Sequence, residues 1–164
     1  MNKKIIISLL LVIIWIGFIY FMSERNGDKS SNDSMQVTRF IVSAYDKIMH
    51  SDKETIAYHQ SEEYLKRVNG VIRKLAHFFE YFVLSCLMLN FLVVLNKFRM
   101  LYINIYNLLF CFLISCLDEL HQTFVNGRAG TVKDILIDSG GVMFGLIIFW
   151  LIYRLICNKR FQNV

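Results

Sequence analysis

The sequence of 164 residues contains no proline, no CxxC pair and no continuous stripe of basic residues. Without a basic stripe or a base-stacking motif, the net charge of +5 does not indicate a nucleic-acid-binding protein. The four cysteines all lie inside apolar segments, which argues against a disulfide framework and favours buried, inert thiols. They are Cys86, Cys111, Cys116 and Cys157. The sequence also has no internal repeat.

Hydrophobic residues dominate the composition. They make up 55% of the chain and include 14 phenylalanines, whereas charged residues make up 19%. A soluble domain of this length could not bury so much apolar surface. The length leaves no room for a separate large catalytic module, so residues 1–164 are predicted to form one domain. The composition therefore predicts an all-α integral membrane protein.

Four apolar segments are long enough to cross a hydrocarbon core about 30 Å thick as helices that rise about 1.5 Å per residue. Only helices satisfy their own backbone groups in lipid at such lengths, so we expect a bundle of four transmembrane helices. The first segment is interpreted as a retained signal anchor, because no small-x-small cleavage site follows it. The expected spans are residues 5–22, 71–95, 101–117 and 135–157.

The distribution of Lys and Arg predicts the orientation of these spans. If the N-terminus is cytoplasmic, the inner side carries seven basic residues and no acid, and all 13 Asp and Glu residues lie outside. The sequence therefore predicts an N-in/C-in protein of the bacterial cytoplasmic (plasma) membrane, with residues 23–70 on the extracytoplasmic side. The inner basic residues are Lys3, Lys4, Lys97, Arg99, Arg154, Lys159 and Arg160.

The extracytoplasmic segment, residues 23–70, begins with a polar stretch, 23–34, that is typical of a flexible linker. Apolar residues then recur at helical spacing over 37–48 and predict an amphipathic helix. This helix either lies on the outer leaflet or caps the bundle; capping is favoured because its polar face is not strongly cationic. A short helix at 62–68 is expected to lead into the second span. The residues expected on the wet face of the amphipathic helix are Arg39, Asp46 and Lys47.

The second span opens with a group of ionisable residues. Arg73, His77 and Glu80 follow i, i+4, i+7 spacing and share one face of a helix, with Lys74 beside it. Arg73 and Lys74 are either interfacial anchors or ligand-binding cations. His77 and Glu80 lie deeper in an apolar helix, where unpaired ionisable groups are costly, so we expect them to face the bundle interior.

The third span closes with a second polar group. Asp118 and Gln122 share a face at i, i+4 spacing, whereas Glu119 and His121 are expected to point elsewhere. A hydrophilic helix end entering water is the simpler interpretation. It suits His121 but poorly explains two adjacent acids directly after an apolar run.

A glycine-bearing loop and two acids open the fourth span. Glycine permits conformations that turn backbone N–H groups toward an anion, and loop 126–131 contains two. Arg128 within this loop is suited to bind a carboxylate or a phosphate. Asp134 is explained by the helix dipole, but Asp138 lies deeper and needs a partner, for which Arg73 and Arg128 are the candidates.

Two glycines continue the face of the fourth span that carries Asp138. Gly141 and Gly145 form a G-x-x-x-G pattern, which lets the backbone of a neighbouring helix approach closely. We therefore expect this face of the fourth span to pack tightly against another span.

Taken in order, these motifs resemble the VanZ-like family over nearly the whole chain. The segments that carry the resemblance are 21–23, 73–81, 118–125, 127–131, Asp134 and 138–142. Asn126 departs from the pattern, since members of the family often carry Pro there. The resemblance implies a bacterial membrane protein. The name-giving member of the family is associated with raised resistance to teicoplanin, which implies a role in the envelope or the glycopeptide response.

Three functions remain open. The first is binding of a membrane lipid, a lipid-linked cell-wall precursor or a lipoglycopeptide at the outer leaflet, with acids holding the cations in place. The binding candidates are Arg73, Lys74, Gln122, Arg128, Asp134 and Asp138. The second is an intramembrane enzyme that uses acid–base or metal-assisted chemistry on a lipid-linked precursor. Its candidates are His77, Glu80, Asp118 and Glu119. The third is a purely structural charge network that locks the spans together.

The sequence assigns no metal ligand and no cofactor. It contains no H-E-x-x-H motif or comparable ligand spacing, and no Ser or Cys stands beside a His in the expected spans or in the polar groups at their ends. We therefore expect neither a zinc-peptidase-like centre nor a nucleophilic dyad encoded by neighbouring residues.

Overall fold

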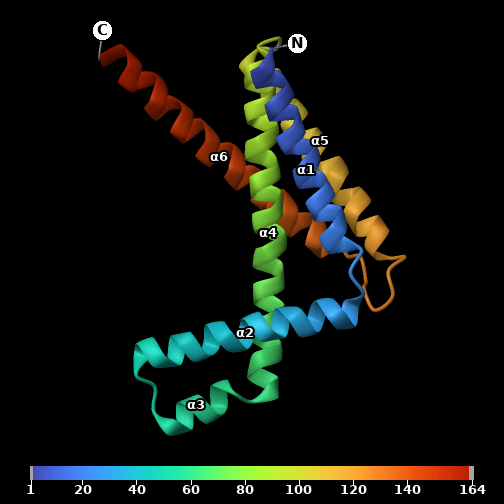
Figure 1. Cartoon of the computed structure of the whole chain (residues 1–164), viewed down its shortest axis with the longest axis vertical. Coiled ribbons are helices and arrows are strands. Elements are labelled where there is room, and N and C mark those ends of the chain that lie inside the picture. The colour runs from blue at the N-terminus through green and yellow to red at the C-terminus, as the bar shows by residue number, and fades with distance from the viewer. Residues whose placement is uncertain (1, 163–164) are drawn as a thin grey trace.

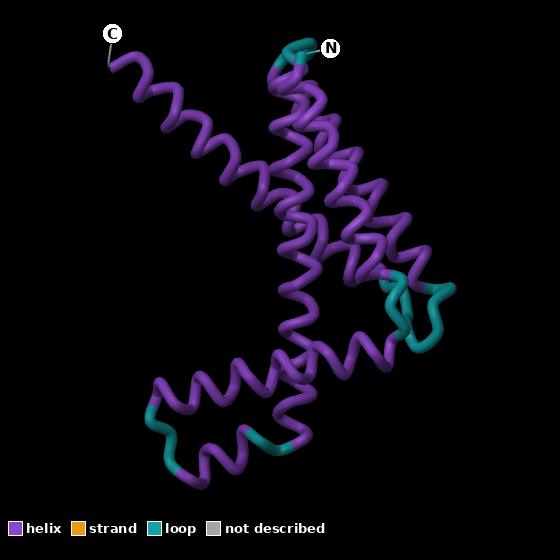
Figure 2. The backbone as a smooth tube through the Cα atoms, in the orientation of Figure 1, coloured by secondary structure: helices purple, strands orange, loops and turns teal. Residues whose placement is uncertain are grey.

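The structure, a computed structural model, describes residues 2–162, except for the side chains of Asp28 and of residues 157–162. Every regular element within this range is an α-helix, which confirms the expected all-α fold (Figures 1 and 2). The helices are α1 (Lys3–Ser23), α2 (Gly27–Met49), α3 (Lys53–His59), α4 (Glu62–Leu95), α5 (Met100–Gln122) and α6 (Val132–Gln162). The expectations for the side chains of Cys157, Lys159 and Arg160 fall outside the described side chains.

Four of these helices are long and apolar enough to cross a membrane. They are α1, α4, α5 and the part of α6 up to Ile156. Each expected span lies within one of them, apart from residue 157 at the end of the fourth. The helix α4 runs on without a break from Glu62, so the short helix expected at 62–68 and the second span are one helix of 34 residues. Gly70 does not end it, because one helical glycine costs only about 1 kcal/mol relative to alanine.

Tight packing of α6 against α4 sets the geometry of the bundle. A Cβ atom added at Gly141 would meet the carbonyl oxygen of Phe78 at 2.2 Å, and one added at Gly145 would meet that of Phe82 at 2.7 Å. The G-x-x-x-G prediction is therefore confirmed. One turn below, the hydroxyl of Ser85 donates to the carbonyl oxygen of Val142 (3.0 Å). As Figure 1 shows, α6 crosses α4 diagonally, and its C-terminal part diverges from the bundle.

The helices α1 and α5 complete the core around α4. Tyr81, Leu84 and Leu89 of α4 are fully buried, and Val12 of α1 packs into the same cluster. The indole N–H of Trp15 donates to the carbonyl oxygen of Glu80 (2.9 Å) and fixes α1 beside the polar part of α4. The outward faces of the spans carry exposed aliphatic and aromatic side chains, as expected for helices surrounded by hydrocarbon.

The polar stretch 23–34 is not a flexible linker, because α2 begins within it at Gly27. Its start is held by the loop before α6: the N–H of Gly27 donates to the carbonyl oxygen of Asn126 (3.0 Å). The contact is so close that a Cβ atom at Gly27 would lie 1.9 Å from the carbonyl oxygen of Gly127. Tertiary contacts thus order a segment whose composition alone favours disorder.

The remainder of α2 lies across the N-terminal part of α4 (Figure 1). Thr38 and Val42 are buried at this contact, and the hydroxyl of Thr38 donates to the side-chain oxygen of Asn69 (3.1 Å). By contrast, Phe40 and Ile48, which belong to the predicted apolar face, are 74% and 75% exposed. The apolar face predicted from the sequence is therefore not the face of α2 that packs against α4.

Asp46 was expected on the wet face of α2, and this expectation is wrong. Asp46 is buried and lies 2.6 Å from the imidazole Nδ1 of His59 at the end of α3. The sequence analysis did not predict α3, although Asp52 caps it by accepting a hydrogen bond from the N–H of Thr55 (2.8 Å). Hydrogen bonds from Thr55 also lower the pKa of Asp52. An N-cap aspartate was the available signal for this helix.

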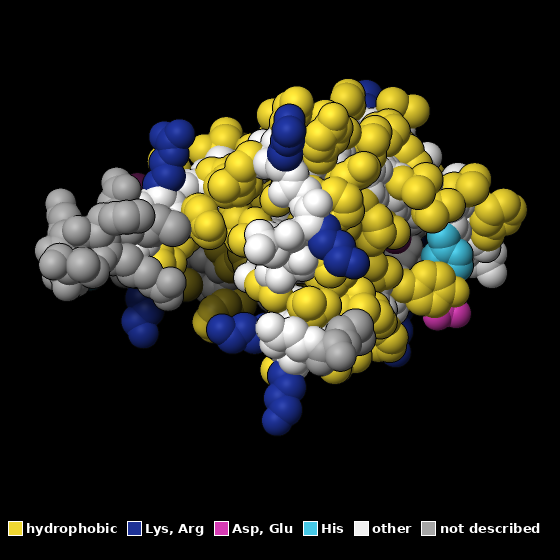
Figure 3. Space-filling model, turned by 90° about the horizontal axis from the view of Figure 1, so that it is seen from above, with side chains coloured by type: hydrophobic (Ala, Val, Ile, Leu, Met, Phe, Trp, Pro, Cys, Tyr) yellow, Lys and Arg dark blue, Asp and Glu magenta, His cyan; other side chains and the backbone are white. Residues whose placement is uncertain are grey.

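The start of α1, the α4–α5 turn and the end of α6 lie at one end of the molecule, and α2 and α3 lie at the other (Figure 1). A view onto the first end shows mainly hydrophobic side chains with Lys and Arg side chains between them (Figure 3). This separation places the basic residues 97 and 99 at the opposite end from α2 and α3.

Candidate functional site

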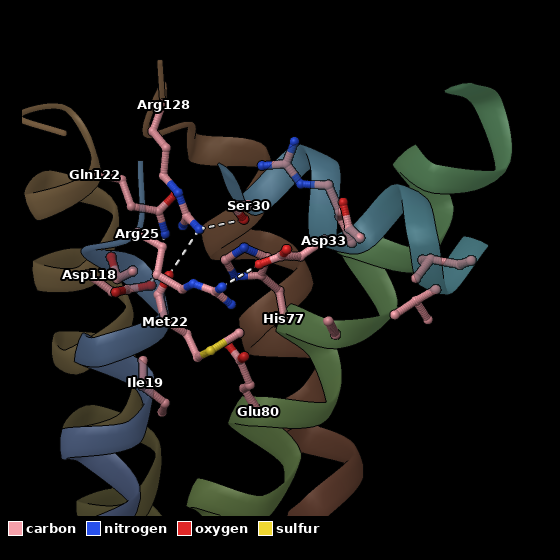
Figure 4. Close-up of a pocket in the computed structure, with 16 residues that line it drawn as sticks. Ile19, Met22, Arg25, Ser30, Asp33, His77, Glu80, Asp118, Gln122 and Arg128 are labelled. Carbon is pink, nitrogen blue, oxygen red and sulfur yellow. Dashed lines mark hydrogen bonds and ion pairs between the residues drawn. The ribbon is translucent and has the colours of Figure 1, made fainter. Parts of the chain in front are cut away.

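A cavity of about 330 Å³ lies between α1, α2, α4 and α5 (Figure 4). Six of the ten residues proposed from the sequence line it: Arg73, His77, Glu80, Asp118, Gln122 and Arg128. Apolar side chains line it as well, namely Ile19, Met22, Val37, Ile72 and Ala76. The wall is therefore mixed, with guanidinium and carboxylate groups beside aliphatic surface.

The face of α4 predicted from the i, i+4, i+7 spacing is confirmed, since Arg73, His77 and Glu80 all line this cavity. A second cavity of about 220 Å³ shares Arg73, His77, Gln122 and Arg128 with the first. Lys74 and Asp134 belong to this second cavity. Glu119 and Asp138 line neither of the two.

Arg128 ties three parts of the chain together. Its Nη2 donates to the carbonyl oxygen of Met22 at the end of α1 (2.9 Å) and to the hydroxyl of Ser30 in α2 (2.9 Å), as Figure 4 shows. The side chain is half-buried, and burial together with the charge of Arg73 lowers the pKa of Arg128. The hydrogen bonds of Arg128 go to neutral groups, while the acids Glu80, Asp118 and Glu119 act on it only through their charges.

Arg73 differs from Arg128 because no hydrogen bond or ion pair with another described residue engages it. Its side chain is exposed at the edge of both cavities. A third cation of the wall, Arg25, was not predicted, and it pairs with Asp33 of α2 (Figure 4). Both lie in the stretch that the sequence analysis assigned to a linker, which is why the pair was missed. Arg73 is thus a guanidinium that remains available to a ligand.

The end of α5 carries three linked polar side chains. The amide nitrogen of Gln122 donates to Asp118 (3.1 Å) and makes a longer contact with Glu119 (3.4 Å). The shared face of Asp118 and Gln122 is confirmed. Glu119, however, does not point away from them, because it is 3% exposed and bonded on the same side. His121 does point elsewhere and lies against the ring of Tyr20, 4.8 Å between centroids.

The glycine-bearing loop does turn a backbone N–H group toward an anion, but that anion is part of the protein. The N–H of Thr131 donates to Oε2 of Glu119 (2.8 Å). The hydroxyl of Thr131 in turn donates to Asp134 (2.8 Å), whose own N–H returns a bond to that hydroxyl (3.2 Å). Gly130 allows this approach, since a Cβ atom there would lie 2.0 Å from the carbonyl oxygen of Glu119. The loop therefore positions Glu119.

Asp138 was expected to pair with Arg73 or Arg128, and this expectation is wrong. The Asp138 side chain is fully buried in α6, where its Oδ2 accepts a hydrogen bond from the hydroxyl of Ser115 in α5 (2.6 Å). Its Oδ1 lies 3.6 Å from Nδ1 of His77 in α4. Both arginines lie near the rim, whereas Asp138 lies one turn deeper than Asp134. Ser115 was missed because a lone serine in an apolar run carries no distinctive pattern.

The three helices thus bring His77, Glu119 and Asp138 together. One potential ligand atom from each lies within 4.8 Å of the others. These residues could hold a metal ion, although they are far apart in the sequence. The spacing of motifs along one helix could not predict this cluster, because its three residues lie on three different helices.

The chain matches the VanZ/LLP1 family over residues 8–153. It belongs to the VanZ/LLP1 family. The match extends from α1 into α6 and so includes every helix that lines the cavities. Comparisons with curated proteins and with solved structures found no match. Membership of the VanZ/LLP1 family agrees with the four helices that are long and apolar enough to span a membrane.

Proposed function

We propose that this VanZ-like protein binds the anionic head group of an envelope amphiphile at the outer leaflet of the bacterial plasma membrane. The candidate ligands are a membrane lipid, a lipid-linked cell-wall precursor and a lipoglycopeptide. Low-level resistance to teicoplanin or a related lipoglycopeptide is the proposed cellular consequence. The observation that carries the proposal is the guanidinium of Arg73, which no other described residue pairs with, at the mouth of a cavity with aliphatic walls.

Several features of the cavity support an anionic ligand. Arg73 lies close enough to Arg128 for their charges to interact, and an anion between them would relieve this repulsion. The Nε of Arg128 is buried and has no partner among the described residues. Guanidinium groups bind phosphate and carboxylate through two parallel hydrogen bonds, which suits both arginines.

The aliphatic wall supports an amphiphile over a small anion. Ile19, Ile72 and Ala76 come from spans that would contact the hydrocarbon core, and they line the cavity together with its polar groups. An acyl or isoprenoid chain could occupy this surface while its head group reaches the arginines. Because the chain of a bilayer amphiphile already lies in hydrocarbon, this surface would contribute through van der Waals packing and not through the hydrophobic effect.

The orientation is part of the proposal and can be tested by itself. We expect a cysteine at Lys53, introduced into a chain whose native cysteines are replaced, to react with a membrane-impermeant maleimide in intact cells. A cysteine at Lys97 should react only after the membrane is permeabilised, because the N-in/C-in arrangement places it in the cytoplasm. Labelling of Lys97→Cys and protection of Lys53→Cys in intact cells would contradict the orientation.

The ligand class can be tested with farnesyl phosphate, a short isoprenoid phosphate, on the purified full chain in detergent. We expect saturable binding that Arg73→Ala weakens about 10-fold or more, since a hydrogen bond to a charged group is worth about 1.5–3 kcal/mol. Microscale thermophoresis would measure the dissociation constant.

Two controls sharpen this binding experiment. Arg67→Ala removes an exposed arginine of the same helix, which pairs with Glu63 (2.5 Å), and should leave the affinity unchanged. Farnesol lacks the phosphate and should bind more weakly than farnesyl phosphate. Equal affinity of the wild type and Arg73→Ala, or equal binding of farnesol, would refute the head-group proposal.

An intramembrane enzyme acting on a lipid-linked precursor is the second candidate function. It is favoured by one observation, that His77 and Glu80 line the same cavity as the arginines. Release of inorganic phosphate from farnesyl diphosphate by water, lost in His77→Gln, would favour it over simple binding. The purely structural alternative instead predicts that charge-swapped double variants of the cluster retain function.

A further inference from the structure

We infer that His77, Glu119 and Asp138 form a binding site for a divalent transition-metal ion, for which Zn²⁺ is the natural probe. The inference goes beyond the head-group proposal and does not depend on it, because neither Arg73 nor Arg128 is among the ligands. It rests on the position, the burial and the unfilled hydrogen-bonding capacity of three side chains from three helices.

The three donors are already close to coordination distances. Zinc binds imidazole nitrogen and carboxylate oxygen at about 2.0–2.2 Å, so two ligands of a tetrahedral site lie about 3.4 Å apart. The Nδ1 of His77 and the Oδ1 of Asp138 are 3.6 Å apart. All three ligand atoms lie within 4.8 Å of one another, so no separation exceeds the tetrahedral spacing by more than about 1.4 Å.

The same atoms lack other partners. Nδ1 of His77 and Oδ1 of Asp138 are buried, and neither has a hydrogen-bond partner among the described residues. The Asp138 side chain is 0% exposed, so water outside the protein cannot satisfy that oxygen. These two atoms face each other at 3.6 Å, beyond hydrogen-bond distance, and a metal ion that both ligate would satisfy them.

The surrounding contacts orient the donors as the outer shell of a metal site does. Oδ2 of Asp138 accepts the hydroxyl hydrogen of Ser115 (2.6 Å), which leaves Oδ1 for the ion. Oε2 of Glu119 accepts the N–H of Thr131 (2.8 Å), which leaves Oε1 with only the 3.4 Å contact to Gln122. Such hydrogen bonds fix the orientation of ligating carboxylates and tune their affinity.

The charge of the cluster also calls for a cation. Among the described residues, no Lys or Arg side chain forms an ion pair with Glu119 or Asp138, and one imidazolium at His77 would balance only one of the two carboxylates. Buried carboxylates are stable only when they are paired or coordinate a metal. One imidazole and two carboxylates suit Zn²⁺ or Mn²⁺ better than Mg²⁺ or Ca²⁺, which prefer oxygen ligands alone.

An ion at this cluster would be accessible from the neighbouring cavities. His77 belongs both to the cluster and to the walls of the two cavities. Three protein ligands leave at least one coordination position for a water molecule or for an oxygen atom of a ligand, as in catalytic zinc sites. The hydroxyl of Tyr81, one turn along α4 from His77, is also buried without a partner among the described residues.

The experiment is metal analysis of the full chain purified without chelator, followed by Zn²⁺ titration after chelation. We expect about one Zn²⁺ or Mn²⁺ ion per chain, and at least a 100-fold lower Zn²⁺ affinity in Asp138→Asn and Glu119→Gln, a larger loss than the about 10- to 100-fold typical of outer-shell changes. Asp33→Asn is the control. It removes a carboxylate that lines the adjoining cavity and pairs with Arg25, outside the cluster, and should bind Zn²⁺ as the wild type does.

Ser115→Ala keeps the experiment decisive if a ligand variant fails to fold, because it removes only the hydrogen bond to Asp138. It should lower the Zn²⁺ affinity about 10- to 100-fold and leave folding largely intact. The absence of any stoichiometric divalent ion, with no saturable Zn²⁺ binding, would overturn the inference and leave an imidazolium–carboxylate pair in its place. Zn²⁺ binding that none of these variants weakens would overturn it as well.

Discussion

Replacing Gly141 by alanine is expected to lower the free energy of unfolding by about 2–3 kcal/mol, the upper part of the range for overpacking. The added methyl group would lie 2.2 Å from the carbonyl oxygen of Phe78, and this neighbour is backbone and cannot rotate away. The helices α4 and α6 would have to separate, which also disturbs the Ser85–Val142 hydrogen bond. Unfolding in mixed micelles by titration with a denaturing detergent would measure the change.

The same helix supplies a graded set of controls. A methyl group at Gly145 would lie 2.7 Å from the carbonyl oxygen of Phe82, whereas one at Gly140 would meet only the ring of Phe78 at 3.6 Å. We expect Gly145→Ala to be destabilising and Gly140→Ala to be neutral or stabilising by up to about 1 kcal/mol, because alanine is the better helix former. If Gly140→Ala destabilised the protein as much as Gly141→Ala, close packing would not explain the loss.

Replacing Arg128 by alanine is expected to release the start of α2 from the bundle. The substitution removes two hydrogen bonds of a charged donor, to Met22 and Ser30, and each such bond is worth about 1.5–3 kcal/mol when buried. Since the side chain is only half-buried, we expect the free energy of unfolding to fall by about 2 kcal/mol. Hydrogen exchange should show faster exchange of the backbone amides in the first turns of α2.

Two variants distinguish the effect of the Arg128 hydrogen bonds from a general effect of charge. Arg128→Lys keeps the charge but lacks the planar fork, so it should restore part of the protection. Arg25→Ala removes an ion pair with Asp33 that is partly exposed, and such pairs contribute about 0–1 kcal/mol. Exchange in α2 that is unchanged by Arg128→Ala would show that the loop contact at Gly27 alone holds the helix.

The spans and the polar face of α4 could be predicted because each depends on a pattern within one helix. Apolar runs define the four spans, and i, i+4, i+7 spacing groups Arg73, His77 and Glu80. The close-packing glycines Gly141 and Gly145 were recognisable for the same reason. Local periodicity thus predicts where a helix lies in the sequence and which of its residues share a face.

The contacts between side chains of different helices could not be predicted. They depend on how far each helix is shifted along its axis relative to its neighbours, which the sequence pattern of one helix does not show. Asp138 binds Ser115 and approaches His77, whereas charge alone had suggested an arginine. Arg128 in turn reaches a neutral carbonyl oxygen and a hydroxyl. The order of α2 depends on a contact between Gly27 and a loop about a hundred residues further along, which no local composition indicates.

The origin of the polar cluster in three separate spans has a consequence for biogenesis. His77, Glu119 and Asp138 leave the ribosome in that order, on α4, α5 and α6. When the first two of these helices have entered the bilayer, an imidazole and a carboxylate remain without the third member of their group. Integration of the last span and completion of the cluster are therefore one event.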